Sequence, residues 1–274
     1  MNSISIVTTS FNRRDLLKKT LDSVLAQTYP HVEQLVFDAA SPDGTADLLR
    51  SYEQKFAAKK YAFRWVSEKD SGQGEAMNKA LAVAMGDFVM ILNSDDFLEG
   101  DSLAVFMNEL ARDPKVDLLY GDHFQVFADG TKRRISHRLY SLDDVVRRGY
   151  QIPQSATIFR RSLLTRTGNF NTLLKVVAEH DLFVRMLRAG ARAKYITEPL
   201  QTTLEHDQRK SGVLGLASLE ETRRVNFSHG ARYRSRFYLL YLKERYAGRA
   251  FRMIEKRAPR MYAGIKRTFH FFSE

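Results

Sequence analysis

Short apolar runs alternate with longer amphipathic stretches over the first hundred residues. The short runs are rich in apolar and β-branched residues, as buried strands are; they occupy residues 3–9, 34–37, 63–66 and 87–92. The longer stretches carry apolar residues three or four positions apart, as amphipathic helices do; they occupy residues 14–27, 45–58 and 73–85. This order predicts an α/β fold with a mostly parallel sheet and helices on both faces.

Polar residues follow each of the four predicted strands. They are Thr8 to Asn12, Asp38, Ser67 to Asp70 and Asn93 to Asp96. In open α/β sheets, ligands bind beyond the carboxyl ends of the parallel strands. We therefore expect the four strand ends to form one ligand-binding crevice.

The pattern beyond residue 100 predicts a second set of elements. We expect a helix at 101–112, strands at 115–121 and 124–127, a hairpin turn at 128–130 and an amphipathic helix at 178–189. Gly86 follows the predicted helix 73–85 at the position that a C-cap would take. From about residue 217 the chain is rich in Arg, Tyr and Phe, and its pattern is mostly helical.

The composition is that of a folded protein rather than a disordered one. The 274 residues are 44% hydrophobic and 27% charged, which is within the usual range for globular proteins. The absence of cysteine excludes disulfides and thiolate metal sites, and it favours a reducing cytoplasm. We also expect no signal peptide and no membrane span, because no apolar run approaches about 20 residues.

The net charge of +11 is concentrated at the end of the chain. Residues 222–274 hold fourteen Lys or Arg and three Asp or Glu, so the remainder of the chain is neutral. Basic residues recur along one face of a predicted helix there, and apolar residues along another; the basic ones are Arg245, Arg249, Arg252 and Lys256. This pattern predicts association with an anionic membrane surface. The alternative is a helix packed on the body, and the neutral body argues against nucleic-acid binding.

The turn Asn93-Ser94-Asp95-Asp96 is the strongest candidate for a metal site. It follows the predicted strand 87–92 directly and lies at the ligand-binding edge of the sheet. Hard oxygen ligands on a short loop suit Mg²⁺ or Mn²⁺ bound together with a diphosphate. The alternative interpretation is a helix N-cap, since Asp is favoured in that position.

Four segments together resemble the family-2 glycosyltransferases of GT-A fold, especially enzymes of bacterial surface polysaccharides of the colanic-acid and O-antigen type. They are residues 5–13, 38–45, 67–80 and 86–96, in the order and spacing of that family. The resemblance implies a GT-A catalytic domain over residues 1–215. Its nucleotide-sugar-binding half would be 1–100 and its acceptor-binding half 101–215. A basic helical extension would then occupy 216–274.

The resemblance also implies roles for residues on the donor side. Thr8 and Phe11 would line the pocket for the base and ribose, with Phe11 stacking on the base. Asp38 would accept a hydrogen bond from the base, most simply from N3–H of uracil. Gly72 and Asn78 lie in the segment that passes the ribose and diphosphate of the donor in the family.

For the metal, the resemblance implies that Asp95 is the last carboxylate of an Asp-X-Asp motif. Asn93 stands where the family has the first carboxylate, so fewer charged ligands would hold Mn²⁺ or Mg²⁺. His206 resembles a late histidine that reaches the metal or diphosphate in some relatives. The alternative for His206 is an ordinary surface residue.

An inverting transfer needs a base for the acceptor hydroxyl. The resemblance places that base at Glu179, with Asp181 as the second candidate. The alternative is that both are first-turn acids favoured by the helix dipole. Gln154 resembles the acceptor-side wall of the family, where histidine is common.

These features predict an inverting, metal-dependent hexosyltransferase. Its donor would be a nucleotide sugar, most simply a UDP-sugar, and its acceptor a glycan or lipid-linked saccharide. It would work in the cytoplasm, at the inner face of the membrane through residues 222–274, with no nucleic-acid partner. The alternative is a catalytically degenerate GT-A domain that binds nucleotide sugar or glycan as an assembly subunit. No strand is followed by a P-loop or a Gly-x-Gly-x-x-Gly motif, so an unrelated nucleotide-binding fold lacks support.

Overall fold

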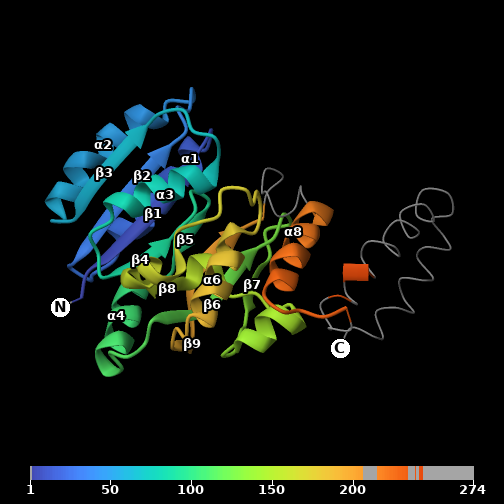
Figure 1. Ribbon diagram of the computed structural model, residues 1–274. Coiled ribbons are helices and arrows are strands. Elements are labelled where there is room, and N and C mark those ends of the chain that lie inside the picture. The colour runs from blue at the N-terminus through green and yellow to red at the C-terminus, as the bar shows by residue number, and fades with distance from the viewer. Residues whose placement is uncertain (1, 206–214, 234–237, 239–240, 243–274) are drawn as a thin grey trace.

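The structure is a computed structural model, and it describes residues 2–205, 215–233, 238, 241 and 242 (Figure 1). The strands are β1 Ile4–Ser10, β2 Val32–Asp38, β3 Ala62–Ser67, β4 Phe88–Ile91, β5 Asp96–Leu98, β6 Leu118–Val126, β7 Lys132–Ile135, β8 Thr157–Arg160 and β9 Ala193–Leu204. The α-helices are α1 Arg14–Leu25, α2 Thr45–Ala58, α3 Gln73–Val83, α4 Ser102–Arg112, α5 Leu164–Thr167, α6 Ala178–Arg188 and α8 Gly215–Ser228. Short π or 3₁₀ turns lie at Asp144–Arg148, Gln154–Ala156 and Arg161–Leu163.

The strands form one sheet in the order β3-β2-β1-β4-β8-β6-β9-β5, with β7 paired to β6. The first four strands are parallel to one another, as the sequence predicts. The second half is mixed, because β8 runs antiparallel to both β4 and β6 while β9 runs parallel to β6. The strand predicted at 87–92 is central: β4 lies between β1 and β8 and all four of its residues are buried.

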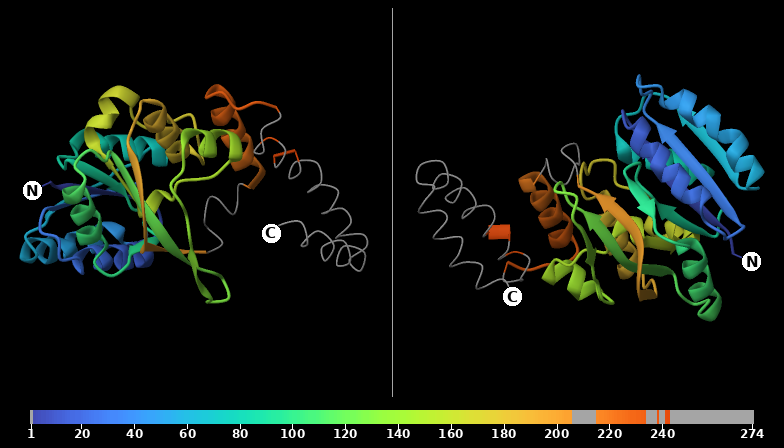
Figure 2. Two further views of the ribbon diagram at one scale, coloured as in Figure 1. Left: turned by 90° about the horizontal axis from the view of Figure 1, so that it is seen from below. Right: turned by 180° about the vertical axis from the view of Figure 1, so that it is seen from behind.

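Alternation along β1 sends side chains into two separate cores. Ile4 and Ile6 join the cluster that contains Leu17 of α1 and Leu49 of α2. Val7 joins the cluster that contains residues of α3 and α6. The prediction of helices on both faces is therefore confirmed. Helices α3 and α6 cover the face turned to the viewer in Figure 1, and α1 comes to the front in the right view of Figure 2.

Two local predictions differ from the structure. The region predicted as two strands at 115–121 and 124–127 holds one long strand, β6 Leu118–Val126; its pairing with β9 shifts register around Asp122. Gly86 does not cap a helix, because α3 ends at Val83 and Ala84 is already extended. Gly86 instead approaches β1 so closely that a Cβ would lie 2.4 Å from the backbone nitrogen of Ser5.

Helix α8 packs beside α6 and places polar groups in their interface (Figure 1). His180 of α6 is 9% exposed, and its Nε2 lies 2.8 Å from Oδ1 of Asn226 on α8. An amide oxygen only accepts, so the ring donates from Nε2. Burial lowers the pKa of both His180 and His229, which keeps these imidazoles neutral near pH 7.

The basic extension falls mostly outside the described residues. His206 and the charged helix face from Arg245 to Lys256 lie there, so the membrane-surface association of residues 222–274 stays a prediction. Within the part of the chain that the structure describes, no helix has the length and apolar character needed to cross a bilayer.

Replacing Gly86 by Ala tests the close approach to β1. The new methyl would meet the backbone of Ile4 and Ser5, which cannot move without disturbing the β1–β4 pairing. We expect Gly86→Ala to lower the free energy of unfolding by about 3 kcal/mol. Gly130→Ala is the matched control: its φ is +81° with open space around it, so its cost is about 1 kcal/mol. If chemical denaturation shows that both variants lose the same free energy of unfolding, this account is contradicted.

The buried histidines make stability depend on pH. An unfolded histidine titrates near pH 6.5, whereas the folded pKa of His180 is lower, so between the two values the unfolded state binds more protons. We expect the free energy of unfolding to be maximal above about pH 6.5 and to fall as the pH is lowered through that value. His180→Gln, which keeps a donor for Asn226, should show a shallower fall in urea denaturation series. If the free energy of unfolding falls equally steeply with decreasing pH in both proteins, His180 is not a source of the pH dependence.

Candidate active site

A cavity of about 1160 Å³ lies at the carboxyl ends of the parallel strands. Its walls come from the loops after β1, β2 and β4, the segment before α3, residues 151–155, the start of α6 and the end of β9. The predicted convergence of strand ends on one crevice is therefore confirmed. Residues 151–155 and the start of α6, where the resemblance placed the acceptor wall and the base, close the opposite side.

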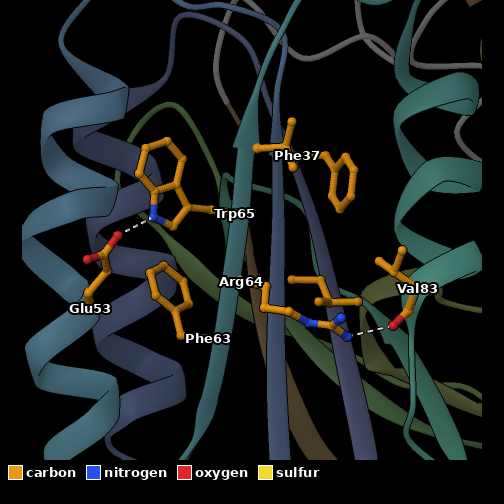
Figure 3. A pocket seen from close by; sticks show the side chains of 8 residues that line it. Phe37, Glu53, Phe63, Arg64, Trp65 and Val83 are labelled. Carbon is orange, nitrogen blue, oxygen red and sulfur yellow. Dashed lines mark hydrogen bonds between the residues drawn. The ribbon is translucent and has the colours of Figure 1, made fainter.

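A second hollow lies on β2 and β3, at the far edge of the sheet (Figure 3). Its polar groups are already engaged: the indole N–H of Trp65 donates to Glu53 at 2.9 Å, and Arg64 pairs with Glu33 and donates to the carbonyl of Val83. The remaining labelled wall is apolar, with Phe37 and Phe63. We therefore place the candidate site in the larger cavity.

Asn93 is the centre of a hydrogen-bond network at the end of β4. Its side-chain amide pairs with that of Gln154, with distances of 3.2 and 3.3 Å in the two directions. Its Oδ1 also accepts from Gln73 at 3.2 Å, and its Nδ2 donates to Oδ2 of Asp96 at 3.0 Å. Asn93 thus connects β4, the start of α3 and the segment before β8 on the cavity floor.

The two adjacent carboxylates of the turn have different surroundings. Asp95 lines the cavity, and its Oδ2 lies 2.6 Å from Nη1 of Arg13 in the loop after β1. Asp96 is 4% exposed and accepts hydrogen bonds from Asn93 and Ser155. Burial and the neighbouring charge of Asp95 raise the pKa of Asp96 to about 6. Both carboxylates line the cavity and both are buried, but Asp95 pairs with the guanidinium of Arg13 whereas Asp96 is bound by Asn93 and Ser155.

On the donor side, Phe11 and Gly72 line the cavity. Phe11 is 57% exposed, so its ring is available for stacking. Gly72 precedes α3 with a φ of +134°, a conformation that favours glycine, and no atom lies within 4 Å of an added Cβ. The chain therefore passes this wall without a side chain to obstruct a ligand.

Three other donor-side candidates lie outside the cavity lining. Thr8 is fully buried and accepts from Gln34 at 3.1 Å. Asp38 is 2% exposed, and its carboxylate accepts from the backbone N–H and hydroxyl of Ser41 and from the hydroxyl of Ser67. Both side chains are buried among protein partners and do not reach the cavity.

Asn78 likewise lies outside the cavity lining, and its side chain binds the backbone of a neighbouring loop. Its Nδ2 donates to the carbonyl of Phe170 and its Oδ1 accepts from the N–H of Phe170, both at 2.9 Å. The amide thereby fastens the loop before α6 onto α3. Thr9 and Ser10 line the cavity where the sequence indicated Thr8.

The two acids in the first turn of α6 have different surroundings. Glu179 lines the cavity and is partly exposed. Asp181 does not line it: its Oδ2 accepts from Nη2 and Nε of Arg185 at 2.7 and 2.9 Å, so its carboxylate is fixed in an ion pair. Of the two candidate bases, only Glu179 is positioned to meet a ligand in the cavity.

A histidine pair lines the wall nearest β6. Nε2 of His137 lies 3.1 Å from Nδ1 of His123, and the rings stack with centroids 5.2 Å apart. Burial lowers the pKa of His137. Asp122 is fully buried behind this pair and accepts from Tyr195, from Arg134 and from the N–H of His137. This wall therefore presents two stacked imidazole rings to the cavity, with both ring nitrogens of His137 engaged by His123 and Tyr140.

Sequence reasoning assigned no role to Arg13, Gln73 or His137, although all three line the cavity. The position of Arg13 gave one local indication of its role. A basic side chain just after the first strand of a parallel sheet lies near the end of the neighbouring strand. Gln73 and His137 had none, because their partners lie far away in the sequence.

The described residues contain no cluster of three acidic, histidine or cysteine side chains that could hold a metal alone. Asp95 still provides a hard carboxylate oxygen at the cavity wall, which suits Mg²⁺ or Mn²⁺ when a diphosphate and water supply the remaining ligands. The donor set thus fits a cation that is shared with a bound ligand. It does not fit a cation caged by protein alone.

Comparisons with known proteins agree with this geometry. The putative teichuronic acid biosynthesis glycosyltransferase TuaG of Bacillus subtilis is 40% identical over 100 residues, which cover 36% of this chain and 38% of TuaG. The chain therefore matches less than half the length of that relative.

Two solved structures share the fold. S. aureus TarS 1–349 in complex with UDP-GlcNAc has a TM-score of 0.70 at 17% identity, over 89% of this chain and 73% of that one. The mannosyltransferase PcManGT of Pyrobaculum calidifontis, in complex with GDP-Man and Mn²⁺, has a TM-score of 0.66 at 20% identity. That match covers 99% of this chain and 80% of PcManGT.

The profile of glycosyl transferase family 2 matches residues 5–177, which include β1 to β8 and all the cavity loops that precede α6. The match extends over more than half of the chain. Together with the strand order and the cavity at the strand ends, it shows that this chain belongs to glycosyl transferase family 2 and has the GT-A fold of surface-polysaccharide glycosyltransferases.

Proposed function

We propose that this glycosyltransferase transfers a sugar with inversion from a UDP-sugar to a hydroxyl of a glycan or lipid-linked saccharide. In this proposal Asp95 holds a divalent cation together with the donor diphosphate, and Glu179 is the base. The observation that carries it is that Asp95, from the turn after β4, and Glu179, from α6, line the same cavity from different walls.

The donor is assigned to the part of the cavity formed by the first half of the chain. Phe11 would stack on the base, and Ala39 and Ala40 leave room beside it. Arg13 and Lys69 place positive charge on the same wall, where a diphosphate would lie. The complexes of TarS with UDP-GlcNAc and of PcManGT with GDP-Man support a nucleotide sugar in this position.

The proposed reaction is a single displacement at the anomeric carbon. The acceptor oxygen forms the new bond as the bond to the leaving diphosphate breaks, and Glu179 takes the hydroxyl proton. A bound cation supplies Lewis-acid stabilisation of the charge that develops on the diphosphate. Attack on the side opposite the leaving group inverts the configuration.

The acceptor is assigned to the wall formed by the second half of the chain. Gln154, His123 and His137 line it, and they offer amide and imidazole groups to sugar hydroxyls. Because Gln154 also pairs with Asn93, acceptor and donor walls are connected at the cavity floor.

A second candidate function is binding of nucleotide sugar without transfer. The observation that favours it is Asn93, which replaces a carboxylate and is saturated with hydrogen bonds to protein. Wild-type protein that binds UDP with Mn²⁺ but neither transfers nor hydrolyses any donor would support this second function and overturn the first.

Substitutions at the three acids separate their roles. We expect Asp95→Ala to abolish both transfer and the Mn²⁺-dependent part of UDP binding. Glu179→Gln should retain UDP binding in calorimetry while kcat falls about 10²- to 10⁴-fold, because the proton acceptor is lost. Asp181→Asn is the control: it should lower Tm by breaking the ion pair with Arg185 but keep most of kcat. A larger kcat loss in Asp181→Asn than in Glu179→Gln would exchange their assignments.

A thermal-shift panel tests the donor. We expect UDP-sugars with Mn²⁺ to raise Tm by mass action, and the shift to shrink without the metal. Phe11→Ala should weaken nucleotide binding about tenfold, since stacking on a base contributes roughly 1–3 kcal/mol. Phe11→Tyr, which keeps a ring, should bind as the wild type does. Stabilisation by GDP-sugars alone would refute the UDP assignment.

A further inference from the structure

Helix α6, which carries Glu179, begins without a cap of its own. Val177 is at its N-cap position, and no side chain of this residue bonds to the helix end. The preceding residues Lys175 and Val176 also have no side-chain oxygen with which to accept backbone N–H groups. The backbone N–H groups of this lead-in segment, residues 175–177, come before the first intrahelical bond of α6, so an acceptor for them has to come from another part of the fold.

Glu221 of α8 supplies the acceptor. Its carboxylate lies 2.9 and 3.1 Å from the backbone N of Lys175, 2.9 Å from that of Val176 and 3.4 Å from that of Val177. Three successive N–H groups thus converge on one anion, an arrangement that is strengthened by its charge and by the positive end of the helix dipole.

A second contact lies on the other side of Glu179. His180 donates from Nε2 to Asn226 of α8 at 2.8 Å, with both side chains buried. Glu179 is therefore flanked, at residues 175–177 and at 180, by groups that are bound to α8. Ser218 of the same helix also lines the cavity. Helix α8 is thus part of the site, although it lies outside the family match at residues 5–177.

We propose that Glu221 is a positioning residue for the reaction, which fixes the lead-in segment and thereby holds Glu179 at the acceptor hydroxyl. It touches neither donor nor acceptor. Removing it would leave the helix start free to move, and a displacement of about 1 Å at the reacting groups lowers a rate about 10²-fold. This inference rests on the proposed role of Glu179 as base.

The test compares Glu221→Ala and Glu221→Gln with Glu220→Ala. Glutamine keeps one acceptor oxygen, so it should partly preserve the contact that alanine loses. Glu220 is the matched control because it lies on the same helix with the same charge, but it bonds to Arg223 and Tyr241 instead of the lead-in segment. We measure kcat, the Kd of UDP with Mn²⁺ by calorimetry, and Tm.

We expect Glu221→Ala to lower kcat about 10- to 100-fold with the Kd of UDP unchanged, and Glu221→Gln to lie between it and the wild type. Glu220→Ala should lower Tm while kcat stays within about twofold. An unchanged kcat in Glu221→Ala overturns the proposal. So does a parallel loss of kcat and UDP affinity in both Glu221 variants, since that would be general unfolding of the site.

A double-mutant cycle separates this inference from the proposed function. Once the base is gone its position no longer matters, so Glu179→Gln combined with Glu221→Gln should be no slower than Glu179→Gln alone. Additive losses would overturn the positioning role. If Glu179→Gln instead keeps the kcat of the wild type, Glu179 is not the base, whatever kcat the Glu221 variants have.

Discussion

The pairing of β4 with β1 on one side and β8 on the other is the constraint on which the site depends. The parallel pair brings the ends of β1 and β4 together, so Arg13 meets Asp95. The antiparallel pair brings the start of β8 to the same point, so Gln154 meets Asn93. One buried strand thereby joins a donor wall that is local in sequence to an acceptor wall that begins about sixty residues later.

The sequence predicts the first half of the fold well, because each element there has a complete local signal. Short apolar, β-branched runs define β1 to β4, and the polar residues after them define the cavity edge. The mixed second half is not predictable in this way: β8 has four residues and is placed by its neighbours. Long-range contacts carry no local signature at all, as with Asn78, whose partner Phe170 is 92 residues away.

Residue type alone also cannot rank the acids of the site. Asp95 and Asp96 are adjacent and both line the cavity, yet Asp95 pairs with Arg13 while Asp96 is bound by Asn93 and Ser155. Glu179 and Asp181 share a helical turn, yet Arg185 binds only the second. For the pair on α6, the packing of the surrounding protein decides which carboxylate lines the cavity, and for the pair after β4 it decides which protein groups each carboxylate binds.

Asn93 stands where the Asp-X-Asp pattern has its first carboxylate, and its hydrogen bonds show what the amide does in that position. A reversion to Asp would leave Asp96 without its Nδ2 donor and would break the reciprocal amide pair with Gln154. It would also gather three carboxylates within four residues, and their mutual repulsion would disfavour the charged forms. Asn93 is therefore matched to its neighbours, and Asn93→Asp alone would break hydrogen bonds that join the two walls of the cavity at its floor.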